Sequence, residues 1–344
     1  MQIGIIGSGS WGTALAKLVT DNQHSIHWTV RNEQVVQHLQ KRKHNLNYLH
    51  SVRFDTNMLF LNTKPAETFA ACDAVVIAVP SAYVVDALEG IDPELIRSRK
   101  IISAVKGILP QTNQLLNDYL RDKYAFPLPH YYTIMGPCHA EEVAAEKLSY
   151  LTFSGIDETA TQEIAACFQG PNLNAVVNTD IYGVQYAAIL KNIYALGAGI
   201  AHGLEYGDNF LSVLIANAAD EMAGFLRMAG IANIEVGVHH DVPLSRRKSP
   251  NYAASVYLGD LLVTSYSLFS RNRTFGNMIG KGYSVKSAQL ELNMVAEGYN
   301  ASRSIHLINQ QFAADIPIVE AIYQILWEQL PAEEGFKKIE EILI

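Results

Sequence analysis

Cysteine is scarce in this sequence, and its three occurrences argue against a disulfide-stabilised fold or a zinc site. Cys72, Cys138 and Cys167 are widely spaced and odd in number among 344 residues, a set that suits a reducing compartment. No C-x-x-C pair is present, and the run His239-His240-Asp241 is not spaced to share one helix face. We therefore expect no metal and no disulfide framework.

Long apolar runs and a surplus of basic residues are missing as well. No stretch reaches the roughly 18 apolar residues that a membrane span needs, and the N-terminus lacks the pattern of a secretory signal. Lys and Arg total 26 against 34 Asp and Glu, and the resulting formal net charge of −8 disfavours general nucleic-acid binding. We expect a soluble, cytoplasmic protein with no nucleic-acid partner and no membrane span, and leave open whether it forms a homodimer.

The first half of the chain alternates short apolar runs with helical patterns. Near-continuous apolar character is typical of parallel strands that are covered on both faces. The expected strands are residues 3–6, 26–30, 74–79, 100–104, 131–135, 150–154 and 174–178. The helices expected between them include residues 13–21, 111–124 and 158–169. This rhythm predicts an α/β fold with a Rossmann-type doubly wound sheet.

A glycine loop, Gly7-Ser8-Gly9-Ser10-Trp11-Gly12, directly follows the first strand and opens the first helix. In this context Gly7 permits the tight turn, Gly9 lets a pyrophosphate approach the backbone, and Gly12 lets helix and strand pack closely. The helix N-terminus then holds the anion. An ordinary glycine-rich turn is the alternative, but the position after a strand, within a βαβ unit, favours dinucleotide binding.

The residue after the second strand bears on which dinucleotide is bound. A site specific for NAD usually carries Asp or Glu here to bond the ribose 2′-hydroxyl. This sequence has Arg31, a cation that favours a 2′-phosphate, with Glu33 close by. The pattern favours NADPH over NADH and leaves both open.

The rhythm changes near residue 180, where long helical patterns replace the strands. The expected helices are residues 182–202, 210–229, 251–269, 284–297 and 301–314. Residues 231–250 are less regular and are expected to form a surface loop or short elements. At roughly 150 residues per domain the chain fits two. We expect a dinucleotide-binding domain at residues 1–180 and an all-α substrate and catalytic domain at residues 181–344.

Lys191 stands out in the helical half as a candidate for chemistry. It is the only formally charged residue between Asp180 and Glu205, so its helix is expected to be buried on most sides. A buried lysine loses hydration, and its pKa falls toward the range useful for proton transfer. The alternative, a lysine whose ammonium reaches solvent, stays open.

Residues 261–290 carry four basic and no acidic side chains. Within them Ser270-Arg271-Asn272 offers a hydroxyl, a guanidinium and an amide, which together match a phosphate group; a solvated basic face is the alternative. In the first half, Ser81, Lys106-Gly107 and Gly136-Pro137 follow strands. They are expected at the sheet edge where ligands of open α/β folds bind.

Taken together, these motifs resemble the bacterial-type NAD(P)-dependent glycerol-3-phosphate dehydrogenases over nearly the whole chain. Many dehydrogenases share the glycine loop, whereas the later motifs in this order are far more specific. The matching motifs are residues 7–16, Val79-Pro80-Ser81, Lys106-Gly107, Gly136-Pro137 with Ala140 and Glu142, Leu190-Lys191-Asn192, Gly259-Asp260-Leu261, Ser270-Arg271-Asn272 and Glu297-Gly298.

The resemblance implies reversible hydride transfer between NAD(P)H and dihydroxyacetone phosphate, giving sn-glycerol 3-phosphate for phospholipid synthesis. Lys191 would accept the proton of the C2 hydroxyl in oxidation and donate it in reduction, and Lys106 would contact both cofactor and substrate. The other cofactor contacts would be Gly7, Gly9, Ser10, Trp11, Gly12, Arg31, Ala140, Arg271, Val295 and Glu297. The other substrate contacts would be Gly136, Cys138, Asp260, Ser270, Arg271 and Asn272.

Because Lys191 and Arg271 fall in the helical half and the glycine loop in the sheet half, the resemblance implies an active site between the domains, whose closure could gate turnover. The sequence departs from the family pattern at three places. Cys138 replaces a Ser or Thr, Ala216-Asn217 replaces a Thr-Arg pair, and the irregular residues 231–257 replace a short glycine-rich stretch.

Two other functions stay open on the sequence. A related two-domain dehydrogenase would act on 3-hydroxyacyl thioesters, 6-phosphogluconate or ketopantoate, whereas the basic residues 261–290 favour a small phosphate ester. A non-catalytic regulator that senses the cofactor would not need Lys191, Asp260 and Arg271. Cofactor preference and regulation by the product are not fixed by the sequence.

Overall fold

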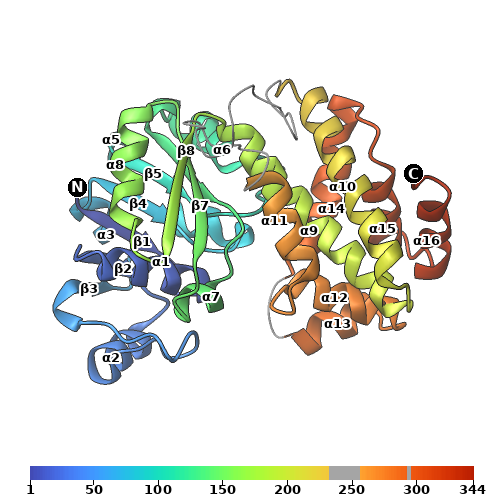
Figure 1. Ribbon diagram of the computed structural model, residues 1–344. Helices are drawn as coiled ribbons and strands as arrows, with labels where there is room; N and C mark the ends of the chain where they lie inside the picture. The colour runs from blue at the N-terminus through green and yellow to red at the C-terminus, as the bar shows by residue number, and fades with distance from the viewer. Residues whose placement is uncertain (232–255, 293–295) are drawn as a thin grey trace, which may run out of the picture. The chain divides into compact units, whose positions relative to one another are not determined.

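The computed structural model describes residues 1–231, 256–292 and 296–344. The chain divides into two compact units, Met1–Ile181 and Tyr182–Ile344. Strands occur in the first unit, and the described part of the second is helical (Figure 1). The predicted fold class is therefore confirmed. Within the described ranges, no helix has the length and apolar character needed to cross a membrane.

The first unit is built on one eight-stranded sheet with the order β3-β2-β1-β4-β5-β6-β7-β8. Its strands are β1 Ile3–Ile6, β2 Ile26–Thr29, β3 Leu59–Asn62, β4 Ala74–Ile77, β5 Lys100–Ser103, β6 Tyr131–Met135, β7 Ser149–Ser154 and β8 Leu173–Asn178. Neighbouring strands are parallel except for β6 and β7. The strand order reverses between β1 and β4, so the carboxyl end of β1 lies where open α/β sheets bind ligands.

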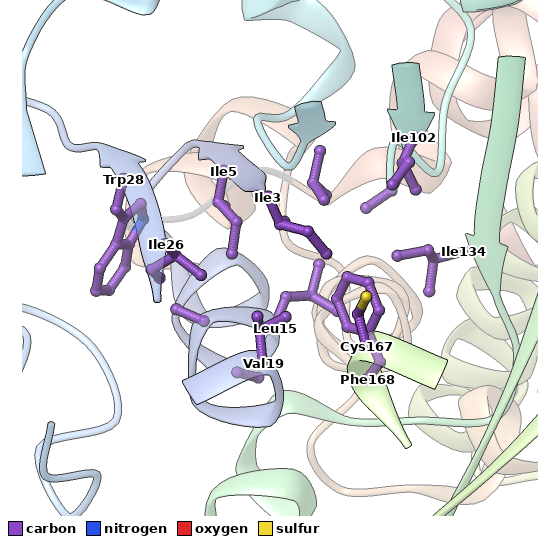
Figure 2. Packing of buried hydrophobic residues seen from close by; sticks show 14 of the residues in the cluster. Ile3, Ile5, Leu15, Val19, Ile26, Trp28, Ile102, Ile134, Cys167 and Phe168 are labelled. Carbon is purple, nitrogen blue, oxygen red and sulfur yellow. The ribbon is translucent and has the colours of Figure 1, made fainter. Parts of the chain in front are cut away.

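Alternate residues of β1 pack against helices on opposite faces of the sheet. Figure 2 shows Ile3 and Ile5 directed toward Leu15 of helix α1, in a buried cluster that also contains Phe168. Gly4 faces helix α3, where an added Cβ would meet the Thr68 side chain at 2.3 Å. The helices of this unit are α1 Ser10–Asp21, α2 Glu33–Arg42, α3 Pro65–Ala71, α4 Val84–Leu88, α5 Pro93–Ser98, α6 Leu116–Tyr124, α7 Ala140–Ala144 and α8 Glu158–Phe168.

All seven predicted strands are present, with ends that differ by up to two residues. Strand β3 was missed, because it is a short edge strand whose Phe60 side chain is about half exposed. The helix predicted at residues 111–124 begins only at Leu116. The preceding residues form a turn closed by a bridge between Leu109 and Gln114, with Asn113 at a positive φ of 54°.

The second unit contains more helices than the sequence analysis expected. They are α9 Ile181–Gly203, α10 Asp208–Met228, α11 Leu258–Tyr266, α12 Arg271–Gly280, α13 Val285–Leu292, α14 Glu297–Phe312, α15 Pro317–Trp327 and α16 Ala332–Glu340. The prediction of one helix over residues 251–269 is wrong at its end, since α11 stops at Tyr266 and Ser270 caps the separate α12. The predicted irregular residues 231–250 lie, apart from residue 231, outside the described residues.

Helices α9 and α12 meet at their backbones through four glycines. An added Cβ on Gly276 would lie 2.0 Å from the carbonyl oxygen of Leu196, and one on Gly199 would lie 2.1 Å from that of Arg273. Gly203 and Gly280 face backbone atoms just as closely. Helix axes normally lie 8–10 Å apart because side chains separate them. Here glycine removes the side chains, so the two helices form one closely packed pair.

We expect Gly276→Ala to destabilise the protein by about 1–3 kcal/mol or more, because the facing atoms are backbone and cannot rotate away. Gly224 of α10 is the matched control, since no atom lies within 4 Å of an added Cβ there. Alanine at that helical position should be neutral or stabilising by about 0.5–1 kcal/mol. Urea unfolding of the two variants measures the difference, and equal effects would contradict the close packing.

Candidate functional site

The glycine loop connects β1 to α1 with the geometry that its three glycines require. Gly7 has a φ of +117°, and an added Cβ there would lie 2.6 Å from the carbonyl oxygen of Ala78. On Gly12 it would lie 2.2 Å from the carbonyl oxygen of Gly7, whereas Gly9 faces open space. The predicted tight turn and close helix packing are therefore confirmed. Gly9 caps α1, which has no acidic residue in its first turn, so the helix end suits an anion.

Two buried side chains from other parts of the chain donate hydrogen bonds to this loop, and the sequence analysis missed both. Trp28 of β2 donates from Nε1 to the carbonyl of Gly7 at 2.9 Å. Asn45 donates from Nδ2 to the carbonyl of Ser8 at 3.0 Å and to Oγ1 of Thr13 at 2.8 Å. No motif marks such residues, because their role depends on contacts distant in sequence.

Trp11 and Lys106 lie together, although they are far apart in the sequence. The Lys106 ammonium lies 4.9 Å from the centre of the Trp11 ring, a cation–π contact. Trp11 Nε1 is buried and has no hydrogen-bond partner among the described residues. The structure thus brings two predicted site residues together beside the loop and leaves a buried donor available to a ligand.

The residues after β6 combine a strained turn with buried small side chains. Gly136 has a φ of +131°, and an added Cβ would lie 2.8 Å from the carbonyl oxygen of Tyr150 on the neighbouring strand. Cys138 and Ala140 are buried, and Ala140 begins α7. Helix α7 packs against α1, where Lys17 makes a 3.1 Å ion pair with Glu146 just beyond α7. These residues therefore occupy the same edge of the sheet as the glycine loop.

Arg31 lies at the carboxyl end of β2, next to the loop. Its side chain is exposed, and its backbone N–H donates to Oγ of Ser8 at 3.3 Å. Glu33, the acidic residue that complicates a sequence-based choice of cofactor, accepts a hydrogen bond from Thr63 at 3.2 Å. Arg31 is thus placed beside the loop, with its guanidinium exposed to solvent.

In the second unit, Lys191 of α9 is 3% exposed and Asp260 of α11 is 1% exposed. The predicted burial of Lys191 is confirmed. Its Nζ forms an ion pair with Oδ1 of Asp260, and Thr264 donates to the backbone carbonyl of Asp260 at 2.6 Å. Because an unpaired buried charge is very costly, Asp260 is what allows an ammonium in this interior. Oδ2 of Asp260 is buried and has no partner among the described residues.

Asn272 links three helices close to this ion pair. Its Nδ2 donates to Oδ1 of Asn192 at 3.0 Å, and its Oδ1 accepts the N–H of Gly298 at 2.9 Å. Asn192 adjoins Lys191, and Gly298 adjoins Glu297 at the start of α14. The resemblance assigns Asn272 to the substrate; in this structure its amide also joins α9, α12 and α14.

Ser270 and Arg271 begin α12. The Ser270 side chain caps the helix by accepting the N–H of Arg273 at 3.3 Å. Arg271 is exposed and makes no ion pair within the described residues. The hydroxyl and the guanidinium therefore lie at a helix N-terminus, a setting that favours anions. The predicted cofactor contact Val295 lies outside the described residues.

Glu221 of α10 is a buried carboxylate that the sequence analysis did not identify. It accepts hydrogen bonds from Tyr194 of α9 at 3.1 Å, from the N–H of Ile318 at 2.7 Å and from the N–H of Val319 at 3.1 Å. Burial raises the pKa of Glu221 to about 7, and the nearby Asp315 adds to the rise. Glu221 thus joins the helix that carries Lys191 to the first turn of α15.

The sequence analysis expected neither disulfides nor a metal site. None of the three cysteines forms a disulfide and all three are buried, and burial raises the pKa of Cys72 to about 12. No group of His, Cys, Asp or Glu that could hold a metal ion occurs among the described residues. The run His239-His240-Asp241 lies outside them.

A doubly wound sheet with a glycine loop at its switch point, followed in the chain by helices that carry a buried lysine–aspartate pair, defines a dinucleotide-dependent dehydrogenase. Two family models match the chain. The model described as the NAD-dependent glycerol-3-phosphate dehydrogenase N-terminus matches residues 2–161. The model described as the C-terminus of the same enzyme matches residues 180–337. The chain belongs to the NAD-dependent glycerol-3-phosphate dehydrogenase family and is an NAD(P)-dependent oxidoreductase.

Individual relatives agree with this assignment. The chain is 31% identical to the glycerol-3-phosphate dehydrogenase (NAD(P)+) of Chlorobium limicola, over 97% of this chain and 96% of that protein. It is 30% identical to the enzyme of the same name from Bacillus pumilus, over 98% and 93%. The crystal structure of glycerol-3-phosphate dehydrogenase from Coxiella burnetii is similar with a TM-score of 0.85 and 25% identity, and it covers 99% of this chain and 98% of that one.

We expect the stability contributed by Glu221 to depend on pH. Because its folded-state pKa is raised from 4.5 to about 7, the folded chain binds this proton more tightly than the unfolded chain does. The contribution is complete below about pH 4.5 and is lost as the pH rises toward 7. Glu221→Gln removes the titration, so the unfolding free energy of the variant should rise by on the order of 3 kcal/mol relative to that of the wild type over this range.

Urea unfolding of both proteins at several values between pH 4.5 and pH 7 measures this difference. A difference in unfolding free energy that stays constant across the range would show that Glu221 does not titrate there.

Proposed function

We propose that this chain catalyses reversible hydride transfer between NAD(P)H and dihydroxyacetone phosphate, giving sn-glycerol 3-phosphate for phospholipid synthesis. The observation that carries the proposal is the buried ion pair of Lys191 and Asp260, within a chain that belongs to the glycerol-3-phosphate dehydrogenase family. We also propose that the enzyme works in the cytoplasm, which is supported by its three buried cysteines, none of which forms a disulfide.

Residues of the first unit fit a bound dinucleotide. Gly7, Gly9 and Gly12 give the loop its turn, its open approach and its packing. The N–H groups of Gly9, Ser10, Trp11 and Gly12 at the start of α1 would hold the pyrophosphate. Lys106 and Ala140 of the same unit are proposed as further contacts, as are Arg271, Val295 and Glu297 of the second unit. The dinucleotide supplies the hydride when bound.

Lys191 is proposed as the group that moves the proton. In reduction, its ammonium polarises the C2 carbonyl and donates a proton to the oxygen as the hydride reaches C2. In oxidation, neutral Lys191 accepts the proton of the C2 hydroxyl. Asp260 keeps the buried ammonium in place, and its unpaired Oδ2 is available to accept a hydrogen bond from a substrate hydroxyl.

Arg271 and Ser270 are proposed to bind the substrate phosphate. An exposed guanidinium can form two charge-assisted hydrogen bonds to a phosphate, and the N-terminus of α12 adds favourable N–H groups. Asn272 retains a second hydrogen on Nδ2 for the same ligand, while Lys106, Gly136 and Cys138 are proposed as contacts from the first unit. The close packing of α9 and α12 fixes the proton donor relative to this phosphate site.

Other substrates of related folds are less well supported. A ketopantoate reductase from Ralstonia eutropha matches 98% of the chain with a TM-score of 0.57 but only 14% identity, so the likeness concerns the fold alone. The assignment of dihydroxyacetone phosphate as substrate is tested by measuring NADPH oxidation with a panel of ketone substrates. Turnover of another ketone without turnover of dihydroxyacetone phosphate would overturn the proposal.

We expect Lys191→Ala to reduce kcat for dihydroxyacetone phosphate by about 10²–10⁴-fold, since it removes the proton donor. NADPH binding, measured by fluorescence titration, should stay close to the wild-type value because Lys191 lies in a different unit from the glycine loop. An unchanged kcat would refute the proton-transfer role. Circular dichroism checks that the variant folds with Asp260 left unpaired.

We expect Arg31→Asp to lower kcat/KM for NADPH by about 10-fold or more and to leave that for NADH little changed. The variant replaces a charge-assisted contact to the 2′-phosphate with a repulsive charge. Lys337→Asp, an exposed residue of α16, makes the same change in net charge and should leave both values unaltered. Equal losses with NADPH and NADH would exclude a role for Arg31 in reading the 2′-phosphate.

A further inference from the structure

Asn45 occupies an unusual position in the first unit. It lies between α2 and the short 3-10 helix Thr56–Met58, in a stretch without regular secondary structure, yet it is only 1% exposed. Its Nδ2 donates to the Ser8 carbonyl at 3.0 Å and to Thr13 Oγ1 at 2.8 Å. Its Oδ1 accepts the N–H of Asn47 at 2.9 Å. Each polar atom of the Asn45 side chain therefore has a partner.

These contacts fix the two peptide groups that flank Gly9. Asn45 holds the carbonyl of Ser8 directly. Thr13, which accepts from Asn45, donates its hydroxyl to the carbonyl of Gly9 at 2.8 Å, and the backbone N–H of Thr13 bonds the same carbonyl at 2.9 Å. The carbonyls of Ser8 and Gly9 are thereby both held in place.

The orientation of each carbonyl determines that of the N–H in the same peptide group. A trans peptide is planar, and its N–H points opposite to its C=O. Holding the carbonyls of Ser8 and Gly9 toward Asn45 and Thr13 therefore turns the N–H groups of Gly9 and Ser10 the other way. Those are N–H groups that a pyrophosphate uses at a helix N-terminus. Without these contacts Gly9 would sample many backbone conformations, and binding of the anion would have to order the loop at a cost in free energy.

Three histidines in edge-to-face contact support the stretch that carries Asn45. The ring of His44 meets the edge of His38 from α2 at 4.7 Å and that of His50 at 5.7 Å. His44 and His50 also contact the backbone carbonyls of Asn45 and Leu46, both at 2.9 Å. Asn45 is thus held by a local structure that does not depend on the loop that it orients.

We propose that Asn45 is a positioning residue for dinucleotide binding, which sets the orientation of the loop N–H groups without touching the cofactor. The proposal rests on the proposed function for the identity of the ligand. In this proposal Asn45 raises the affinity for the pyrophosphate. It does not affect the chemical step or the binding of the adenosine end of the cofactor.

The test compares Asn45→Ala with Asn47→Ala. The control removes an exposed amide two residues away and keeps the backbone N–H that Asn45 uses. In Asn45→Ala, the Kd and KM for NADPH should rise about 10-fold, with kcat at saturating NADPH within about twofold of the wild type. The Kd for adenosine 2′-monophosphate, which lacks the pyrophosphate, should not change. Asn47→Ala should match the wild type in each measurement.

Thr13→Val provides a second route, because it removes the hydroxyl between Asn45 and Gly9 at nearly constant volume. Its Kd for NADPH should also rise, and the double variant should lose less than the product of the two single losses. If Asn45→Ala does not fold, Thr13→Val decides by the same readouts. A Kd for NADPH within twofold of the wild type, or an equal loss for adenosine 2′-monophosphate, would overturn the proposal.

Direct titration separates this proposal from the proposed function. A wild-type chain that binds NADPH but does not reduce dihydroxyacetone phosphate would refute the substrate and still allow the test of Asn45. A wild-type chain that binds no dinucleotide would refute both.

Discussion

The chemistry proposed for this molecule depends on one buried ion pair. A lysine ammonium in a protein interior is stable only if an opposite charge compensates its lost hydration, and Asp260 supplies that charge from a different helix. Several contacts near Lys191 support this arrangement. Thr264 bonds the backbone of Asp260, Asn272 ties the neighbouring residue Asn192 to two further helices, and the glycines of α9 bring α12 into contact. Under the proposed function Lys191 donates the proton, and this packing explains how its charge is kept in the interior.

Glycines allow close backbone contacts in both units, but these contacts have different roles. In the first, glycines let a turn and a helix end approach one another and leave backbone N–H groups for an anion. In the second, glycines let two helices meet so that polar side chains next to them keep fixed distances. Polar side chains then lock each arrangement, Asn45 in the first unit and Asn272 in the second. A buried amide is well suited to this, since it donates and accepts at once.

The sequence predicts the features that are local and leaves out those that depend on distant contacts. The strands, the glycine loop and the isolation of Lys191 each follow from a short pattern. Strand β3 was missed because it is a short strand at the sheet edge with Phe60 about half exposed. Helix α12 was missed because its glycines lower helix propensity while they serve packing. The roles of Asn45 and Glu221 could not be predicted from the sequence either, because their hydrogen-bond partners are far away in the chain. The pairing of Asp260 with Lys191 could be seen only in three dimensions.

The interlocked backbones of α9 and α12 also restrict how such an enzyme can change over evolution. At the four positions where glycine meets the facing backbone, no side chain can be shortened, and any larger residue would meet backbone atoms. A lineage that adapts to a bulkier or longer substrate must therefore reshape other walls of the site, through loops or through helices that meet by ordinary side chains. The spacing between Lys191 and the start of α12, the proposed proton donor and the proposed phosphate site, should therefore change least, and new specificities should arise around it.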